Sequence, residues 1–327
     1  MDAIPAVDWT AAAALGATLV PPGPRLRPHE IATLVAGVRR SAARATDLVA
    51  AASQLDAPPP GDVLVVDRAS WIRANAAMAR VMVDSARDDA DSTAPSLRRR
   101  VGARVSGAEI GAVLALVATR ILGQFDPFGT PPRLLLVAPN LVAVERSLGV
   151  DPDDFRLWVC LHEETHRFQF GAAPWLPGHL LGLFGDVLRG EGVALTGWRP
   201  GTSQLGDLVL SPAQRATLAD ITAVMSLLEG HADVLMDRAG TGVIGSLATL
   251  RATFERRRDA GGPAQLIGRV LGLNLKREQY REGAAFCRAV LDAAGVAGLN
   301  RVFAGPESLP TLDELRDPDR WLTRMGA

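Results

Sequence analysis

The stretch of the chain best suited to chemistry is the pattern His-Glu-x-x-His that begins at His162. On an α-helix, residues four apart share a face, so His162 and His166 can direct two imidazole nitrogens at one metal ion. Glu163 follows the first histidine and can reach the open coordination position beside such an ion. The pattern predicts a zinc-dependent hydrolase with about one zinc ion per chain, in which Glu163 is the general base toward a zinc-bound water.

The residues before the motif predict the helix that such a site requires. Asp151 can cap a helix N-terminus, and Pro152 follows at the first helical position. Apolar residues then recur at helical spacing as far as Phe168. We therefore expect a helix that carries the motif and stops near Gly171, where Pro174 enforces the break.

A catalytic zinc site takes three protein ligands, so a third must be found. Glu229 and Asp233 are four residues apart on an expected helix, so one face can offer a carboxylate to zinc and another to the Nδ1 atom of a ligand histidine. His231 lies about 200° around that helix from Glu229, so both cannot face one ion. We expect Glu229 as the third ligand and Asp233 as the residue that orients a histidine, with His231 as the alternative ligand. The full set of downstream candidates is His179, Glu191, Glu229, His231 and Asp233.

Hydrolysis also benefits from a hydrogen-bond donor to the oxyanion that forms in the transition state. Tyr280 is the only tyrosine in the chain, and its phenol is the candidate donor. A tyrosine at a helix boundary is more often a packing residue, so that interpretation stays open. His231 is a competing donor if Glu229 is the ligand.

A non-catalytic protein with a structural metal or a partner-binding cleft is the alternative function. A structural site would be closed by a fourth protein ligand such as His179 or Cys160, whereas a catalytic site keeps one position open for water. Cys160 lies two residues before His162 and therefore well around the helix, which favours a buried apolar cysteine over a ligand.

Longer stretches around the motif resemble an uncharacterised bacterial family of zincin-like metalloproteases or hydrolases, whose members are often associated with biosynthesis of the deazaflavin coenzyme F420. The resemblance implies a zinc-dependent fold with an unidentified substrate. It is carried by residues 137–140, 144–146, 149–158 and 174–176, and at the two ends by residues 8–9, 21–24, 66–71, 279–283 and 309–312.

Two named classes of metallopeptidase differ in how they supply the third ligand. The spacing of Glu229 and Asp233 resembles the glutamate helix of the gluzincins. The H-x-x-G-x-x-H extension of the metzincins is absent, because Gln169 and Ala172 occupy the relevant region. The chain is therefore expected to be gluzincin-like.

The composition and net charge of the chain indicate where the protein acts and which partners to expect. The net charge of −1 gives no electrostatic reason to expect nucleic acid or an anionic membrane. Two cysteines are too few for a disulfide-stapled secreted scaffold, and no basic segment precedes an apolar run at the N-terminus. We expect a cytoplasmic protein that acts on a peptide or small amide substrate, with no nucleic-acid and no membrane partner.

The spacing of apolar residues predicts where the remaining helices, strands and loops lie. The stretch 107–122 has fewer than the ~20 apolar residues that a bilayer requires, so we expect a core helix there. The strand 134–137 is expected to be an edge strand that aligns an extended substrate. Helices are also expected over 28–53, 67–82, 177–188 and 222–237, a strand over 63–66, and loops or turns over 86–100, 124–129 and 190–212.

Together these elements predict a mainly α protein (α+β with a small sheet) of zincin-like architecture. At 327 residues the chain can form one domain over 1–327. Within it, the motif helix would lie between an N-terminal helical lobe, about 1–130, and a metal-binding and C-terminal helical lobe, about 131–327.

Overall fold

The computed structural model describes residues 6–59, 61–87, 97–189, 211–259 and 277–326, and for 97–98, 255–259 and 277–280 it describes the backbone only. The protein is mainly helical with one small sheet, as the sequence predicts. The elements before the motif are α1 (Trp9–Leu19), α2 (Pro28–Ser53), β1 (Asp62–Val66), α3 (Arg68–Ser85), α4 (Leu97–Ala118), β2 (Gly123–Asp126), β3 (Arg133–Val137) and α5 (Ala138–Leu148). They are followed by α6 (Pro152–Ala172), α7 (Leu176–Arg189), α8 (Pro212–Gly240), α9 (Leu247–Asp259), α11 (Arg277–Asn300), α12 (Leu312–Arg316) and α13 (Pro318–Met325).

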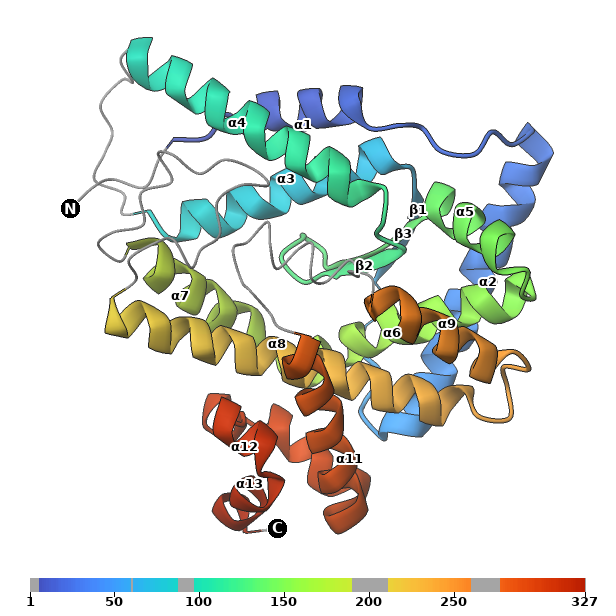
Figure 1. Cartoon of the computed structure of the whole chain (residues 1–327), viewed down its shortest axis with the longest axis vertical. Coiled ribbons are helices and arrows are strands. Elements are labelled where there is room, and N and C mark those ends of the chain that lie inside the picture. Colours follow the sequence, from blue (N-terminus) through green and yellow to red (C-terminus); the bar gives the residue numbers. More distant parts are fainter. Residues whose placement is uncertain (1–5, 60, 88–96, 190–210, 260–276, 327) are drawn as a thin grey trace.

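The sheet forms the middle layer of the molecule. Its strand order is β1-β3-β2, with β1 parallel and β2 antiparallel to β3. Successive side chains of a strand point to opposite faces. Accordingly, Leu134 and Leu136 pack in one core with residues of α2 and α6, whereas Leu135 and Val137 pack in another with residues of α3 and α4. Figure 1 shows the strands between these two groups of helices.

Strands β1 and β2 form the two edges of the sheet, and β2 is the edge next to α6. The predictions of an edge strand over 134–137 and of a turn over 124–129 are wrong. In the structure β3 is the central strand, and the turn begins only at Asp126, whose carboxylate accepts hydrogen bonds from the backbone N–H groups of Phe128 and Gly129. The edge of the sheet next to α6 is therefore a short strand that begins with a glycine.

Helix α6 begins and ends close to where the sequence predicts. The carboxylate of Asp151 accepts hydrogen bonds from the backbone N–H groups of Asp153 and Asp154, and Pro152 occupies the first turn. The helix is buried along most of its length. Cys160 is 1% exposed and its thiol faces the carbonyl of Val38 on α2, which confirms the prediction of a buried cysteine.

Helix α8 begins ten residues earlier than the expected Thr222. Ser211 and Gln214 form a reciprocal capping box around the first turn, and Pro212 lies at its start. Further along, a side chain at Gly230 would collide with the backbone at Gly283, so α8 and α11 can approach closely only through these two glycines. This contact is immediately next to Glu229.

Helix α4 also starts earlier than expected, at Leu97, so residues 97–100 of the predicted loop are helical. The stretch Arg99–Ala118 is long and apolar enough to cross a membrane, with a mean hydropathy of 1.6, and 39% of its apolar 18-residue window is buried. It packs against α1 and α3. Most of the predicted loop over 190–212 lies outside the described residues, and the division into two lobes stays a prediction.

Candidate metal centre

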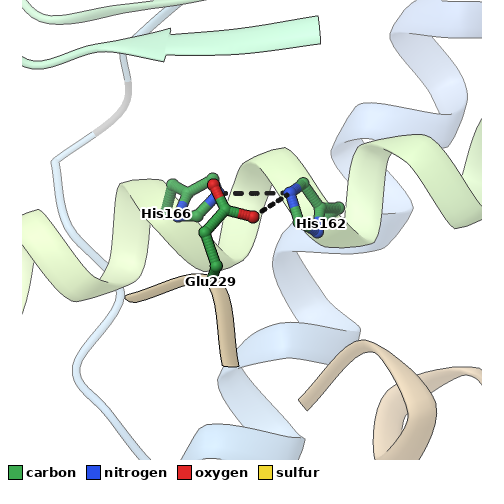
Figure 2. Close-up of side chains that lie close together, drawn as sticks. All are labelled: His162, His166 and Glu229. Carbon is green, nitrogen blue, oxygen red and sulfur yellow. Dashed lines mark hydrogen bonds and ion pairs between the residues drawn. The ribbon is translucent and has the colours of Figure 1, made fainter. Parts of the chain in front are cut away.

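Two helices bring three metal-ligand side chains together. His162 and His166 come from α6 and Glu229 from α8, and Figure 2 shows the three pointing toward one another. The Nε2 atoms of the two histidines are 3.2 Å apart. The carboxylate oxygens of Glu229 lie 3.6 Å from Nε2 of His162 and 3.8 Å from Nε2 of His166. The structure therefore brings together the three residues that the sequence analysis selected as ligands.

This group of donors fits a zinc ion. Bonds from zinc to nitrogen and oxygen are ~2.0–2.2 Å long, so two ligand atoms on a tetrahedral ion lie roughly 3.3–3.5 Å apart. The separations of 3.2, 3.6 and 3.8 Å fall around that value. Three electron-rich atoms this close repel one another unless a cation or a proton lies between them. Two imidazoles and one carboxylate are also a usual set of protein ligands in catalytic zinc sites.

Gln169 holds the second histidine in place. Its Oε1 atom lies 2.9 Å from Nδ1 of His166, one helical turn earlier. An amide oxygen only accepts hydrogen bonds, so Nδ1 carries the proton and Nε2 keeps its lone pair for the other ligand atoms. This role of Gln169 was not predicted from the sequence, although its i, i+3 spacing from His166 was the available signal.

Asp233 is the residue that the sequence analysis expected behind a histidine. It is half-buried on α8 and lies near Cys287, where its negative charge adds to the effect of burial in raising the pKa of the thiol. At His166 the partner is Gln169. The orienting role of Asp233 therefore stays a prediction, and it can apply only to His162.

Glu163 lies beside the ligand group without being part of it. It is 7% exposed, and its carboxylate accepts a hydrogen bond from the backbone N–H of Phe125 on β2. Burial, and then the negative charge of Glu229, raise the pKa of Glu163 to about 8. A carboxyl group with a pKa near neutrality can accept a proton and release it again, as a general base must.

The edge strand provides the space that Glu163 occupies. A Cβ atom at Gly123 would lie 2.6 Å from Cγ and 2.9 Å from Oε1 of Glu163, so no larger residue fits without moving the carboxylate. The backbone N–H of Val137 donates to the carbonyl of Leu122, and this register turns the backbone groups of Gly123 and Phe125 away from β3. The outer edge of β2 therefore faces the metal-ligand group.

His231, the alternative ligand, does not belong to the ligand group. It is fully buried, with Nδ1 3.0 Å from Nε2 of Gln169 and its ring edge-on to Phe303 at 5.1 Å between centroids. Burial, and then the proximity of His166, lower the pKa of His231 to about 3. The geometry favours Glu229 over His231 as the third ligand.

The other candidates lie apart from the group or outside the described residues. His179 is half-buried on α7 with its ring against Trp175, and Glu191 is not described. Tyr280 lies in α11, but its side chain is outside the described residues. Among the side chains that the structure describes, no fourth histidine, cysteine or carboxylate joins the group, and Cys160 faces α2 instead.

A two-histidine helix, a glutamate from a second helix and a nearby edge strand together define a zincin-like site. The chain belongs to the zincin-like metallopeptidase family, whose model matches residues 7–322. None of the curated proteins compared with this chain matches it. Among solved structures, it is similar to a Chloroflexus aurantiacus protein described as "a putative hydrolase with a novel fold". The identity is 29% and the TM-score 0.75, over 98% of this chain and 99% of the other.

These comparisons support a hydrolase of metallopeptidase type and a metal as its cofactor. They give no support to an association with deazaflavin biosynthesis, which stays an expectation from the resemblance. A cytoplasmic location, a peptide or amide substrate and the lack of nucleic-acid or membrane partners also stay predictions.

Proposed function

We propose that this protein is a zinc-dependent hydrolase that cleaves a peptide bond or a small amide. The observation that supports it most directly is the convergence of His162, His166 and Glu229, with Glu163 next to them on the same helix. A zinc ion held by these three residues would supply Lewis acidity, which polarises a substrate carbonyl and acidifies a water molecule. The protein's own part is then to hold the ion, to accept the proton and to position the substrate.

Glu163 takes the proton in this proposal. Its carboxylate is fixed by Phe125 and lies against Gly123, so it is oriented before substrate arrives. It neighbours His162 in sequence and therefore lies to the side of the ligand face. The raised pKa suits a group that first accepts a proton from water and then passes it to the leaving nitrogen.

The edge strand and α11 would position the substrate. An extended peptide can hydrogen-bond to the outward backbone groups of Gly123 and to the outward carbonyl of Phe125 on β2, because the N–H of Phe125 is already bound to Glu163. Tyr280 lies three residues before Gly283, which packs on α8 next to Glu229. This placement supports Tyr280 as the donor to the oxyanion.

Metal binding and cleavage test the proposal separately. Wild-type protein should carry about one zinc ion per chain by elemental analysis. Glu229→Ala should weaken zinc binding, in a competition titration, by more than the ~10–100-fold typical of a residue behind a ligand, whereas His231→Ala should weaken it less. The reverse ranking would transfer the ligand role to His231. A wild-type protein that binds zinc but cleaves nothing in peptide-library and proteome screens would be the non-catalytic alternative.

A further inference from the structure

A single buried amide joins the two helices that carry the candidate ligands. Gln169 on α6 is 0% exposed, and its side chain has three partners. Its Oε1 atom lies 2.9 Å from Nδ1 of His166. Its Nε2 atom lies 2.8 Å from the carbonyl oxygen of Leu228 and 3.0 Å from Nδ1 of His231. The amide therefore uses its acceptor and both of its donor hydrogens.

The carbonyl of Leu228 determines which way the amide points. A backbone carbonyl only accepts, so the NH₂ group of Gln169 must face it. The flipped amide would place its oxygen against the carbonyl oxygen of Leu228, and these two acceptors would repel each other. Because Leu228 directly precedes Glu229, the hydrogen bond also ties α6 to the peptide unit next to the third ligand.

The amide orientation in turn determines where both imidazoles carry their protons. With Oε1 facing it, His166 is protonated on Nδ1, and its Nε2 lone pair points to His162 and Glu229. With an N–H facing it, His231 keeps a lone pair on Nδ1 and is protonated on Nε2. That Nε2 atom is buried and has no hydrogen-bond partner among the described residues, so Gln169 is the hydrogen-bond partner that sets this tautomer.

We propose that Gln169 is the positioning residue of the metal centre: its fixed amide holds His166 in the one neutral tautomer whose Nε2 can bind a metal, and ties the Glu229 turn of α8 to α6. The inference rests on the proposed metal site. A carboxylate in this place would orient His166 equally well but would set an oxygen against the carbonyl oxygen of Leu228, which explains an amide here.

The tautomers can be measured in the metal-free protein. Long-range ¹H–¹⁵N correlation spectra report which ring nitrogen of each histidine carries the proton, and the five histidines can be assigned by single replacements. We expect opposite tautomers in the wild type, with His166 protonated on Nδ1 and His231 on Nε2. A wild-type His166 that is protonated on Nε2, or that exchanges between tautomers, would overturn the inference.

Two variants separate the acceptor from the donors. Gln169→Leu removes all three hydrogen bonds, so His166 should lose its single tautomer and zinc affinity should fall by ~10–100-fold. Gln169→Glu keeps an acceptor for His166 but offers no donor. In this variant His166 should stay protonated on Nδ1, while the proton of His231 should move to Nδ1 to meet the carboxylate.

Gln214→Leu is the matched control. Gln214 is 3% exposed in the capping box of α8, fifteen residues from Glu229, which is about 22 Å along a helix. Its loss should lower thermal stability but change neither the tautomers nor zinc affinity.

If Gln169→Leu binds zinc as tightly as wild type, or if Gln214→Leu weakens zinc binding equally, the inference is wrong. If Gln169→Leu does not fold, the histidine tautomers in the wild type and in Gln169→Glu test the inference instead. If wild type binds no zinc, the proposed function fails, while the tautomers still test Gln169.

Discussion

Two consecutive glutamates on α6 lie on different faces of the helix and meet opposite surroundings. Glu164 is 1% exposed and is paired with Arg167, whose guanidinium lies 2.7 Å from it. Arg167 also donates to the carbonyls of Pro58 and Pro59, which ties this face of α6 to the segment before β1. Glu163 is 7% exposed and meets no cation among the described residues. Its neighbours are the N–H of Phe125 and the negative charge of Glu229.

The difference separates a structural carboxylate from a chemical one. A buried charge is costly unless a partner compensates it, and Arg167 is such a partner for Glu164. Burial raises the pKa of Glu164 as well, but the charge and the hydrogen bond of Arg167 oppose that rise. Glu163 has no such partner, so its charged form is disfavoured and its pKa is raised to about 8. Uncompensated titratable groups of this kind cluster at functional sites, and the cation that would compensate this one is a metal held by the neighbouring histidines.

The largest effect is expected for Glu163→Gln, which tests whether Glu163 has a chemical role that Glu164 lacks. The amide has the size of the carboxyl group and can still accept from Phe125, but it cannot take a proton from water. Hydrolysis of a substrate found for the wild type should fall by ~10²–10⁴-fold, while zinc content and folding are retained. Steady-state kinetics, elemental analysis and circular dichroism on the same preparation measure all three. A variant that cleaves as fast as wild type would remove Glu163 from the mechanism.

The same substitution one residue later should act on stability instead. Glu164→Gln leaves the guanidinium of Arg167 buried with a weaker partner, and breaking a buried ion pair costs about 3–5 kcal/mol of unfolding free energy. Urea denaturation of the metal-free protein would show this loss, and Glu163→Gln serves as its control. If both variants lose stability equally, the two faces of α6 do not differ as described.

Gly123→Ala moves the proposed general base, Glu163, without replacing it. The new methyl group would overlap Glu163, so the carboxylate must shift away from Gly123. A misplacement of about 1 Å can cost ~10²-fold in rate, so we expect a loss of this order in kcat with zinc affinity preserved. An unchanged kcat would show that the carboxylate has room to adjust.

The parts of the molecule that the sequence predicted correctly depend on local signals. The motif helix was predicted because its cap at Asp151, its apolar period and the His162–His166 spacing all lie within one stretch. Glu229 was selected because a carboxylate was needed and the i, i+4 spacing to Asp233 offered one. These inferences need helical geometry and metal chemistry but no knowledge of packing.

The parts that were missed depend on contacts between distant segments. Strand β2 is a short stretch with a glycine at its start, and it becomes a strand only by pairing with β3. The partners of Gln169 on α8 lie about sixty residues along the chain. The start of α8 was misplaced for another reason: Ser211 and Pro212 were taken as the end of a loop, although a capping serine followed by proline also begins a helix.

The most gradual effect we predict is the pH dependence of stability that Glu163 causes. The pKa of Glu163 in the folded metal-free protein is about 8, above its ordinary value of 4.5. Between these two values the folded state holds a proton that the unfolded state has released, so the unfolding free energy of the wild type falls as pH rises. The slope due to this group is at most about 1.4 kcal/mol per pH unit. The amide in Glu163→Gln does not titrate, so the unfolding free energy of this variant should lack this fall with pH.

The difference between the two proteins isolates this group from other titrations. His231 acts in the opposite direction, because its pKa in the folded state is about 3 against an ordinary 6.5, so it makes stability rise with pH between those values. It is present in both proteins, and its contribution cancels when their unfolding free energies are subtracted. Both proteins would be denatured with urea in the presence of a chelator, from about pH 5 to pH 8. The unfolding free energy of Glu163→Gln minus that of the wild type should rise over this whole range. A constant difference would mean that Glu163 is already charged in the folded protein, and its contrast with Glu164 would then lie in position rather than in electrostatics.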